Sequence, residues 1–325
     1  MKTRMQLSKP PLERQISVRI QPLEDGCTIL DFLCQRFTYQ NRGQWLQDLQ
    51  DGRLTLTNNA TPLPDTTLIA GDKLTYRAPV LIEPPVNFNC TVIHQDSDLI
   101  VVNKPGQLPC HPGGRYFRHT LWGLLKERFG LEKPSIINRL DRETSGLVLI
   151  AKHGAAARSC CEQFAAHQVQ KRYFVLVEGI FPFKEIVADG FLLPDQHSVV
   201  RKKVRFVSLD SDTGLTTKAT ACSTGFKFLK SSNHISLLEA RPISGRCHQI
   251  RATLHSLGFP VVGDKVYGVD EQLFIRFIEQ RLSPLDKAML RLDRQALHCS
   301  SLELRHPADG RQMAFFAPMP NEFIF

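Results

Sequence analysis

Short apolar segments separated by polar loops recur along most of the chain, and their spacing predicts both strands and helices. The apolar runs at 99–102, 147–151 and 173–177 are typical of buried strands. Residues 155–167 and 272–282 instead have a helical spacing, and Leu273, Phe274 and Phe277 would share one helix face. Short strands mixed with a few helices predict an α+β domain with a largely antiparallel sheet over residues 88–325.

The N-terminal part predicts a smaller, separate module at residues 16–78. Thr28 is a candidate cap for a first helix, residues 41–52 predict a second, and 53–57 and 70–77 have the pattern of strands. This order resembles the alpha-L RNA-binding module, although the dense basic helix of such modules is missing. A small α/β appendage without a binding role is the alternative. Residues 1–15 predict a flexible tail, and the proline-rich residues 79–87 predict a stiff linker.

Composition is that of a globular protein, with 42% hydrophobic and 22% charged residues. The net charge of +9 comes from 41 basic and 32 acidic residues, and residues 1–87 hold only 10 and 9 of them. The surplus therefore lies in the larger domain and favours a polyanionic partner. Nine cysteines without a C-x-x-C pair, and no signal peptide or membrane span, lead us to expect a cytoplasmic protein without a zinc site.

A loop between two predicted strands concentrates charge. Arg139, Asp141, Arg142 and Glu143 are four charges within five residues, flanked by apolar runs at 135–137 and 147–151. Neighbouring guanidinium groups keep a partly buried carboxylate ionised, as a catalytic site requires. A structural ion pair between strands explains the pattern equally well.

Two basic segments are candidates for RNA contact. Residues 111–119 interleave Arg115 and Arg118 with aromatic residues, a combination that suits phosphate contact and base stacking. Residues 201–205 include Lys202 and Lys203, which would contact phosphate groups. For the second segment an ordinary exposed turn is an equal alternative.

Three segments together resemble the signature segments of the RluA-type pseudouridine synthases. The family pattern H-R-L-D-x-x-T-S-G corresponds to NRLDRETSG at 138–146, the K-x-Y segment to KRY at 171–173, and G-R-x-H-Q-[IL]-R to GRCHQIR at 245–251. The resemblance covers residues 88–320. Asn138 replaces the usual histidine, as in a branch of the family with N-R-L-D.

The resemblance implies residue roles. Asp141 would be the catalytic aspartate, Tyr173 the active-site tyrosine and Arg251 the partner of the aspartate, while Arg139 would help to fill the space that a flipped uridine leaves. We expect substrate contacts also from Arg246 and His248 in the third segment.

The implied activity is isomerisation of uridines in structured rRNA or tRNA, with a pseudouridine synthase fold. We expect RNA as the partner, no cofactor, no metal and a monomer. The alternative is an RNA-binding or RNA-chaperone protein on the same scaffold, with catalysis secondary.

Overall fold

The computed structural model describes residues 14–57, 59–79, 83–209 and 219–324. The chain divides into two compact units, of which one ends at Glu83 and the other begins at Pro84. The predicted tail at 1–15 and linker at 79–87 lie partly outside the described residues. Among the helices described, none combines the length and apolarity needed to span a bilayer.

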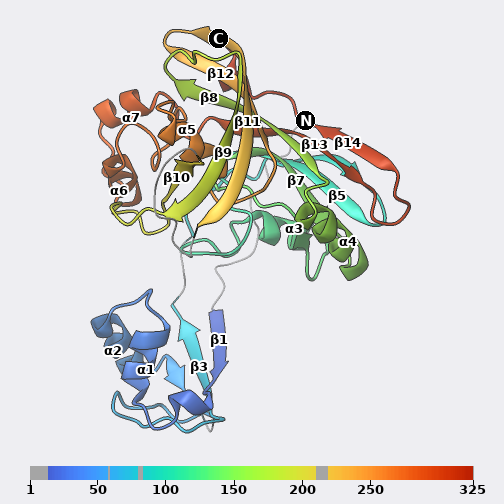
Figure 1. Cartoon of the computed structure of the whole chain (residues 1–325). Coiled ribbons are helices and arrows are strands. Elements are labelled where there is room, and N and C mark those ends of the chain that lie inside the picture. Colours follow the sequence, from blue (N-terminus) through green and yellow to red (C-terminus); the bar gives the residue numbers. More distant parts are fainter. Residues whose placement is uncertain (1–13, 58, 80–82, 210–218, 325) are drawn as a thin grey trace. The chain divides into compact units, whose positions relative to one another are not determined.

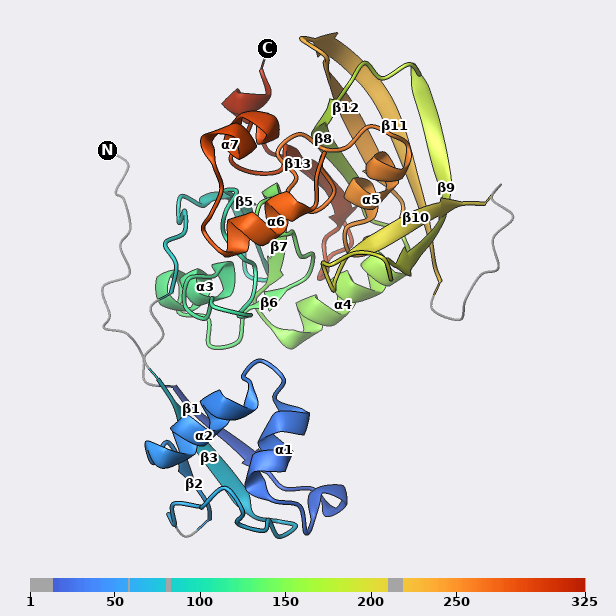
Figure 2. The same cartoon turned by 90° about the vertical axis from the view of Figure 1, so that its left-hand side faces the viewer.

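The N-terminal unit packs two short helices against a three-stranded sheet ordered β1-β3-β2 (Figure 2). Thr28 caps the first helix as predicted, because its hydroxyl accepts the backbone N–H of Asp31. Strand β1 begins at Arg14, before the predicted start of the module at residue 16, and it was not predicted from the sequence. The elements are β1 (Arg14–Arg19), a 3-10 helix (Pro22–Glu24), α1 (Ile29–Arg36), α2 (Arg42–Gln50), β2 (Leu54–Thr55) and β3 (Lys73–Ala78).

The larger unit is built on one eleven-stranded sheet (Figure 1), and this agrees with the prediction of an α+β domain with a largely antiparallel sheet. Its path is β10-β9-β11-β12-β8-β13-β7-β5-β4, with β14 beside β13 and β6 beside β7. Between the described strands, all pairings are antiparallel except that of β7 with β13. The strands are β4 (Thr91–Gln95), β5 (Leu99–Lys104), β6 (Ser135–Ile136), β7 (Ser145–Ala151), β8 (Gln170–Glu178), β9 (Glu185–Pro194), β10 (Val204–Ser208), β11 (Thr220–Ser232), β12 (Ile235–Pro242), β13 (Leu297–Arg305) and β14 (Gln312–Phe316).

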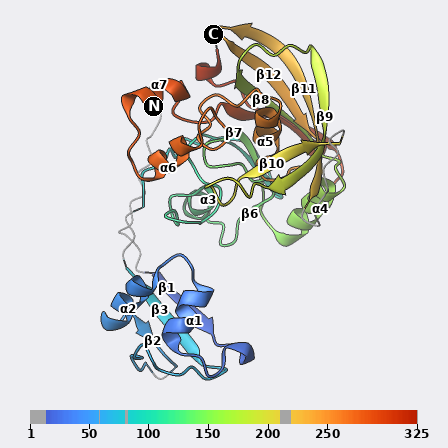
Figure 3. The same ribbon diagram turned by 60° about the vertical axis from the view of Figure 1, so that its left-hand side comes forward.

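Helices cover the sheet locally. The helix that begins within the GRCHQIR segment, α5, lies within the curve formed by β9, β10, β11 and β12 (Figure 3). Helix α4 packs against β7 at the other half of the sheet. The helices are α3 (Leu121–Phe129), α4 (Gly154–Ala165), α5 (Gln249–Ser256), α6 (Gln272–Ile278), α7 (Pro284–Leu290) and a 3-10 turn (Asn321–Phe323).

The two halves of the sheet join at the parallel contact of β7 and β13. A Cβ atom on Gly146 would lie 2.2 Å from the carbonyl oxygen of Cys299, so only glycine allows this approach. Each half has its own apolar core, and Tyr173 packs against both cores. The join therefore brings the charged loop before β7 to the KRY and GRCHQIR segments, although the three are far apart in the sequence.

Candidate active site

A cavity of about 490 Å³ opens at this join. It draws its lining from the loop before β7, from β8, and from the segment that leads into α5. Seven of the ten residues predicted from the sequence line it: Arg139, Asp141, Tyr173, Lys202, Arg246, His248 and Arg251.

The centre of the site is a guanidinium group held between two carboxylates. Arg251 donates from Nη1 to Asp141 Oδ2 at 2.7 Å. On its other side it donates from Nε to Asp264 Oδ2 at 2.6 Å and from Nη2 to Asp264 Oδ1 at 2.8 Å. The second pair is bidentate and buried, since Asp264 has no exposed surface and Arg251 is 5% exposed. This geometry fixes the guanidinium in position before any substrate arrives.

Asp264 is the main functional residue that the sequence analysis did not assign. The backbone N–H groups of Val266 and Tyr267 also donate to its Oδ1, so its orientation is fixed by a turn as well as by Arg251. The signal in the sequence was the segment GDKVYG at 263–268. An aspartate beside a turn glycine is common enough that the segment alone did not indicate this role.

The surroundings of Asp141 keep its carboxyl group ionised. Burial raises its pKa, but the positive charge of Arg251, with smaller contributions from His248 and the Gln295 amide, outweighs burial and lowers the pKa below the ordinary value of 3.8. The side chain remains 31% exposed, towards the cavity. The carboxylate of Asp141 is therefore charged and accessible to a molecule bound in the cavity.

Asn138 anchors the loop that carries Asp141 to strand β7. Its amide nitrogen donates to the carbonyl of Leu147 at 3.0 Å, and its amide oxygen accepts from the N–H of Leu149 at 2.7 Å. The side chain thus extends the sheet by two hydrogen bonds directly before Asp141. The departure from the family histidine is accommodated by this structural role.

Glu143 fixes the far side of the same loop. Lys265 donates to its Oε2 at 2.9 Å, and the backbone N–H of Gln295 contacts the same oxygen at 3.2 Å. Gln295 in turn donates to the hydroxyl of Thr144 and, at 3.3 Å, to Asp141. The charges at 139–143 are therefore divided: Glu143 stabilises the loop, and Asp141 faces the cavity.

Tyr173 is a partly buried residue of β8, two positions before the buried stretch that starts at Val175, and it lines the cavity. Burial raises its pKa well above 10.0, with further contributions from the neighbouring Cys299 thiol and from Asp141. Tyr173 is therefore a neutral phenol at physiological pH, able to stack on a base and to donate or relay a proton.

His248 faces the carboxylate rather than the solvent. Its Nδ1 lies 3.0 Å from the hydroxyl of Tyr267 and its Nε2 3.8 Å from Asp141 Oδ1. Burial and the charge of Arg251 lower its pKa below 6.5, so the ring is neutral at pH 7. His248 therefore offers the cavity a neutral hydrogen-bonding group and not a positive charge.

Three predicted RNA-contact residues lie outside the cavity lining. Lys203 is buried and its ammonium group donates to Glu271 at 2.8 Å, which corrects the expectation of a free phosphate contact. Arg118 is half-buried and pairs with Glu127 at 2.8 Å, beside α3. Arg115 is exposed. Lys202, next to the buried Lys203, is exposed and does line the cavity.

The sequence of this domain matches known proteins. Residues 98–256 match the RNA pseudouridylate synthase family. The ribosomal large subunit pseudouridine synthase D of Zymomonas mobilis is 31% identical over 246 residues, which cover 73% of this chain and 72% of the relative. Human pseudouridylate synthase RPUSD2 is 32% identical over 74% of this chain, and the match spans 42% of that longer protein.

Solved structures agree in fold. The human RNA pseudouridylate synthase domain containing 4 superposes with a TM-score of 0.54 at 25% identity, over 72% of this chain and 90% of the other. The fold and the site define an RNA-modifying enzyme of the pseudouridine synthase class. The chain belongs to the RNA pseudouridine synthase family, in its RluA-type group.

Loss of the buried carboxylate should destabilise the protein. We predict that Asp264→Asn lowers the free energy of unfolding by roughly 3–5 kcal/mol in urea, because it leaves Arg251 with one partner in a buried setting. Glu279→Gln, which removes an exposed ion pair with Arg281, is the control and should change stability little.

The effect of Asp264→Asn should depend on pH. Arg251 lowers the pKa of Asp264 below 3.8 against the opposing effect of burial. The ionised carboxylate therefore contributes its full stability at pH values above 3.8, the ordinary pKa of an aspartate. This contribution is lost as the pH falls through the lower pKa that Asp264 has in the folded protein. The difference between wild type and variant should narrow below about pH 4; a constant difference down to pH 2 would contradict the ion-pair account.

Proposed function

We propose that this protein isomerises specific uridines in structured rRNA or tRNA to pseudouridine, with Asp141 as the catalytic carboxylate. One observation carries the assignment of the residue: an ionised, partly exposed carboxylate lies in a cavity, with Arg251 fixed against it. The cavity, about 490 Å³, is within the range of small-ligand sites and is large enough for one extruded base.

The reaction breaks the bond from N1 of uracil to C1′ of ribose and rejoins the base through C5. Asp141 acts as nucleophile or base at the sugar and ring, and Arg251 keeps it charged. The base rotates within the cavity, where it stacks against Tyr173. When the C5–C1′ bond forms, the Asp141 carboxylate is restored, C5 loses a proton and N1, no longer bonded to C1′, gains one, so no net proton is consumed. The neutral phenol of Tyr173 serves as a relay in that transfer by giving up its own proton as it receives the one from C5. Because no oxidation or group transfer occurs, we propose that the reaction needs no cofactor and no metal.

A uridine in folded RNA has to leave its stack to reach Asp141. Arg139 is exposed beside the cavity and is placed to occupy the gap. Lys202 and Arg246 add exposed positive charge around the cavity, where they would contact phosphate groups. The basic residues around the cavity would thus bind the RNA backbone, and the cavity itself would bind the extruded uridine.

Finer assignments extend this proposal. The N-R-L-D sequence supports the branch of the family with asparagine at this position, and the anchoring bonds of Asn138 show how the residue is accommodated. All nine cysteines are free thiols, which supports a cytoplasmic enzyme. A monomer is proposed as well, and light scattering coupled to size-exclusion chromatography would test it. A binding protein without activity would not require the Asp141, Tyr173 and Arg251 arrangement.

Removal of the charge on Asp141 tests the function directly. We predict that Asp141→Asn reduces pseudouridine formation on an RNA pool that lacks the modification to background, while RNA affinity changes little because phosphate contacts lie elsewhere. Glu127→Gln, outside the cavity lining, is the control. A folded Asp141→Asn protein with normal turnover would contradict the mechanism. Wild type that binds RNA tightly but never forms pseudouridine would favour the binding-protein alternative.

Adjacent lysines provide a matched test of the RNA surface. We predict that Lys202→Ala decreases the slope of log affinity against log salt by about one unit, since it removes one phosphate contact. Lys203→Ala should leave the slope unchanged and lower stability instead, because Lys203 is paired with Glu271. Equal slopes for wild type and Lys202→Ala would exclude this contact.

The N-terminal unit is proposed to increase affinity or orient the RNA rather than to take part in chemistry. Its separate core and its lack of cavity residues support this division. We predict that a protein starting near Val86 retains turnover at high enzyme concentration and binds RNA more weakly, as measured by filter binding and single-turnover kinetics. Complete loss of turnover in a folded truncation would contradict it.

A further inference from the structure

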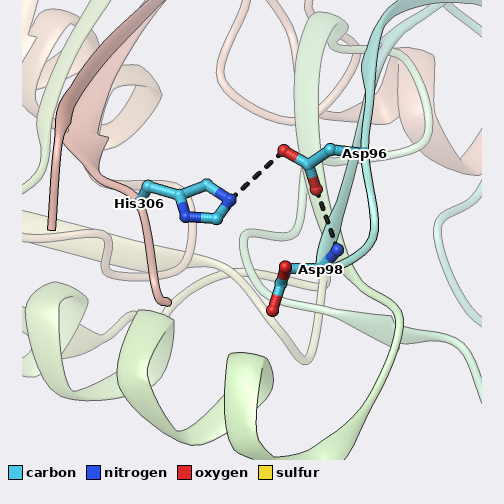
Figure 4. A group of neighbouring side chains, drawn as sticks. All are labelled: Asp96, Asp98 and His306. Atoms are coloured by element: carbon cyan, nitrogen blue, oxygen red, sulfur yellow. Dashed lines mark hydrogen bonds and ion pairs between the residues drawn. The ribbon is translucent and has the colours of Figure 1, made fainter. Parts of the chain in front are cut away.

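A group of histidine and aspartate side chains lies at the turn between β4 and β5, and none of its members lines the catalytic cavity. Asp96 and Asp98 belong to the turn, and His306 directly follows β13 (Figure 4). Their donor atoms all lie within 4.8 Å of one another. His94, at the end of β4, contacts the same carboxylate. His306 and Asp96 are 210 residues apart in the sequence, so no sequence motif predicts the group.

Two imidazoles point at one carboxylate oxygen. His306 Nε2 lies 3.2 Å and His94 Nε2 2.6 Å from Asp96 Oδ2. The other oxygen, Asp96 Oδ1, accepts the backbone N–H groups of Asp98 and Leu99 at 2.8 and 2.7 Å, which fixes the carboxylate in the turn. The orientation of Oδ2 towards the histidines is therefore set by the backbone, and not by the histidines alone.

The second ring nitrogen of His306, Nδ1, has a hydrogen-bond partner in either tautomer of the imidazole. The Asp309 carboxylate lies 3.1 Å from Nδ1 and accepts a proton there, whereas the backbone N–H of Ala308 donates to an unprotonated Nδ1 at 3.3 Å. A carboxylate behind a histidine is the arrangement that leaves Nε2 free to bind a metal. His306 is also 94% buried, being 6% exposed, so its ring is held in place.

Distances fit a small metal ion. Bond lengths of about 2.0–2.2 Å place the ligand atoms of a tetrahedral zinc site roughly 3.3–3.6 Å apart. The separation of His306 Nε2 from Asp96 Oδ2 is already 3.2 Å.

The charge of the group also suits a cation. Asp96, Asp98 and Asp309 supply three carboxylates.

We propose that Asp96, Asp98 and His306 form a site for a zinc-like divalent transition metal, with water as the fourth ligand. One imidazole nitrogen and two carboxylate oxygens match the preference of this metal class. His94 is not a ligand in this proposal, and its hydrogen bond to Asp96 Oδ2 instead helps to hold that carboxylate in place. His153, 3.0 Å from Asp98 on the side of α4, orients the second carboxylate.

The ion would connect distant parts of the chain. It joins the β4–β5 turn to the segment that follows β13, and through His153 to the start of α4. Its effect is therefore on stability. The proposal departs from the sequence-based expectation of a protein without a zinc site or metal, and it leaves unchanged the proposal that the reaction needs no metal.

Cobalt provides a direct probe. Full-length protein, treated with a chelator and with its accessible thiols alkylated to exclude exposed cysteine ligands, is titrated with Co²⁺ and then with Zn²⁺. We expect one equivalent of Co²⁺ with the visible absorption of a four-coordinate ion, its displacement by Zn²⁺, and a higher melting temperature with Zn²⁺.

Variants locate the bound ion. Asp98→Asn and His306→Gln should each weaken binding by at least about tenfold, while circular dichroism confirms folding. His197→Gln, an exposed histidine elsewhere, is the control and should bind like wild type. If His306→Gln fails to fold, the half-buried Asp98 still decides the outcome. Absence of the four-coordinate spectrum, or equal affinity of wild type and Asp98→Asn, would overturn the proposal.

Discussion

The guanidinium group of Arg251, shared between a buried and a half-exposed carboxylate, is the interaction on which the site depends. Asp264 is fully buried and Asp141 faces the cavity, so the same cation neutralises a structural charge and prepares a reactive one. Removal of either partner leaves an uncompensated charge in a poorly solvated place. The arrangement explains why a carboxylate can remain ionised in a cavity lined partly by apolar groups.

The sheet places this ion network where its two halves join. Gly146 allows β7 and β13 to approach, Tyr173 packs against both cores, and Asn138 attaches the loop before β7 to that strand. The loop that carries Asp141 is therefore held from both ends. A catalytic group positioned by strands needs little rearrangement when the substrate binds, which favours a fixed geometry for the reaction.

The sequence predicted much of this arrangement because local patterns report local structure. The apolar runs identified β5, β7 and β8, and Thr28 identified the start of α1. The three signature segments identified Asp141, Tyr173 and Arg251, which the fold brings to one cavity.

Contacts between distant segments could not be predicted in the same way. Nothing in the chain near Lys203 shows that Glu271 will bury it, and nothing near Arg251 shows that Asp264 will hold it. Strand β1 was missed because its pairing with β3 lies almost 60 residues away, between Ile16 and Tyr76 for example. The contact between His306 and Asp96 could not be predicted either, because the two residues are 210 positions apart in the sequence.

The most direct test of the central claim is the titration of the Asp141 carboxyl group itself. The carbon-13 signal of this carboxyl group, assigned by its absence in Asp141→Asn, can be followed by NMR from pH 7 to pH 4 in the protein without RNA. A carboxylate stabilised by Arg251 should show no protonation over this range, because its pKa is held below 3.8. A titration with a midpoint above pH 4 would show that burial outweighs Arg251, and it would contradict the account.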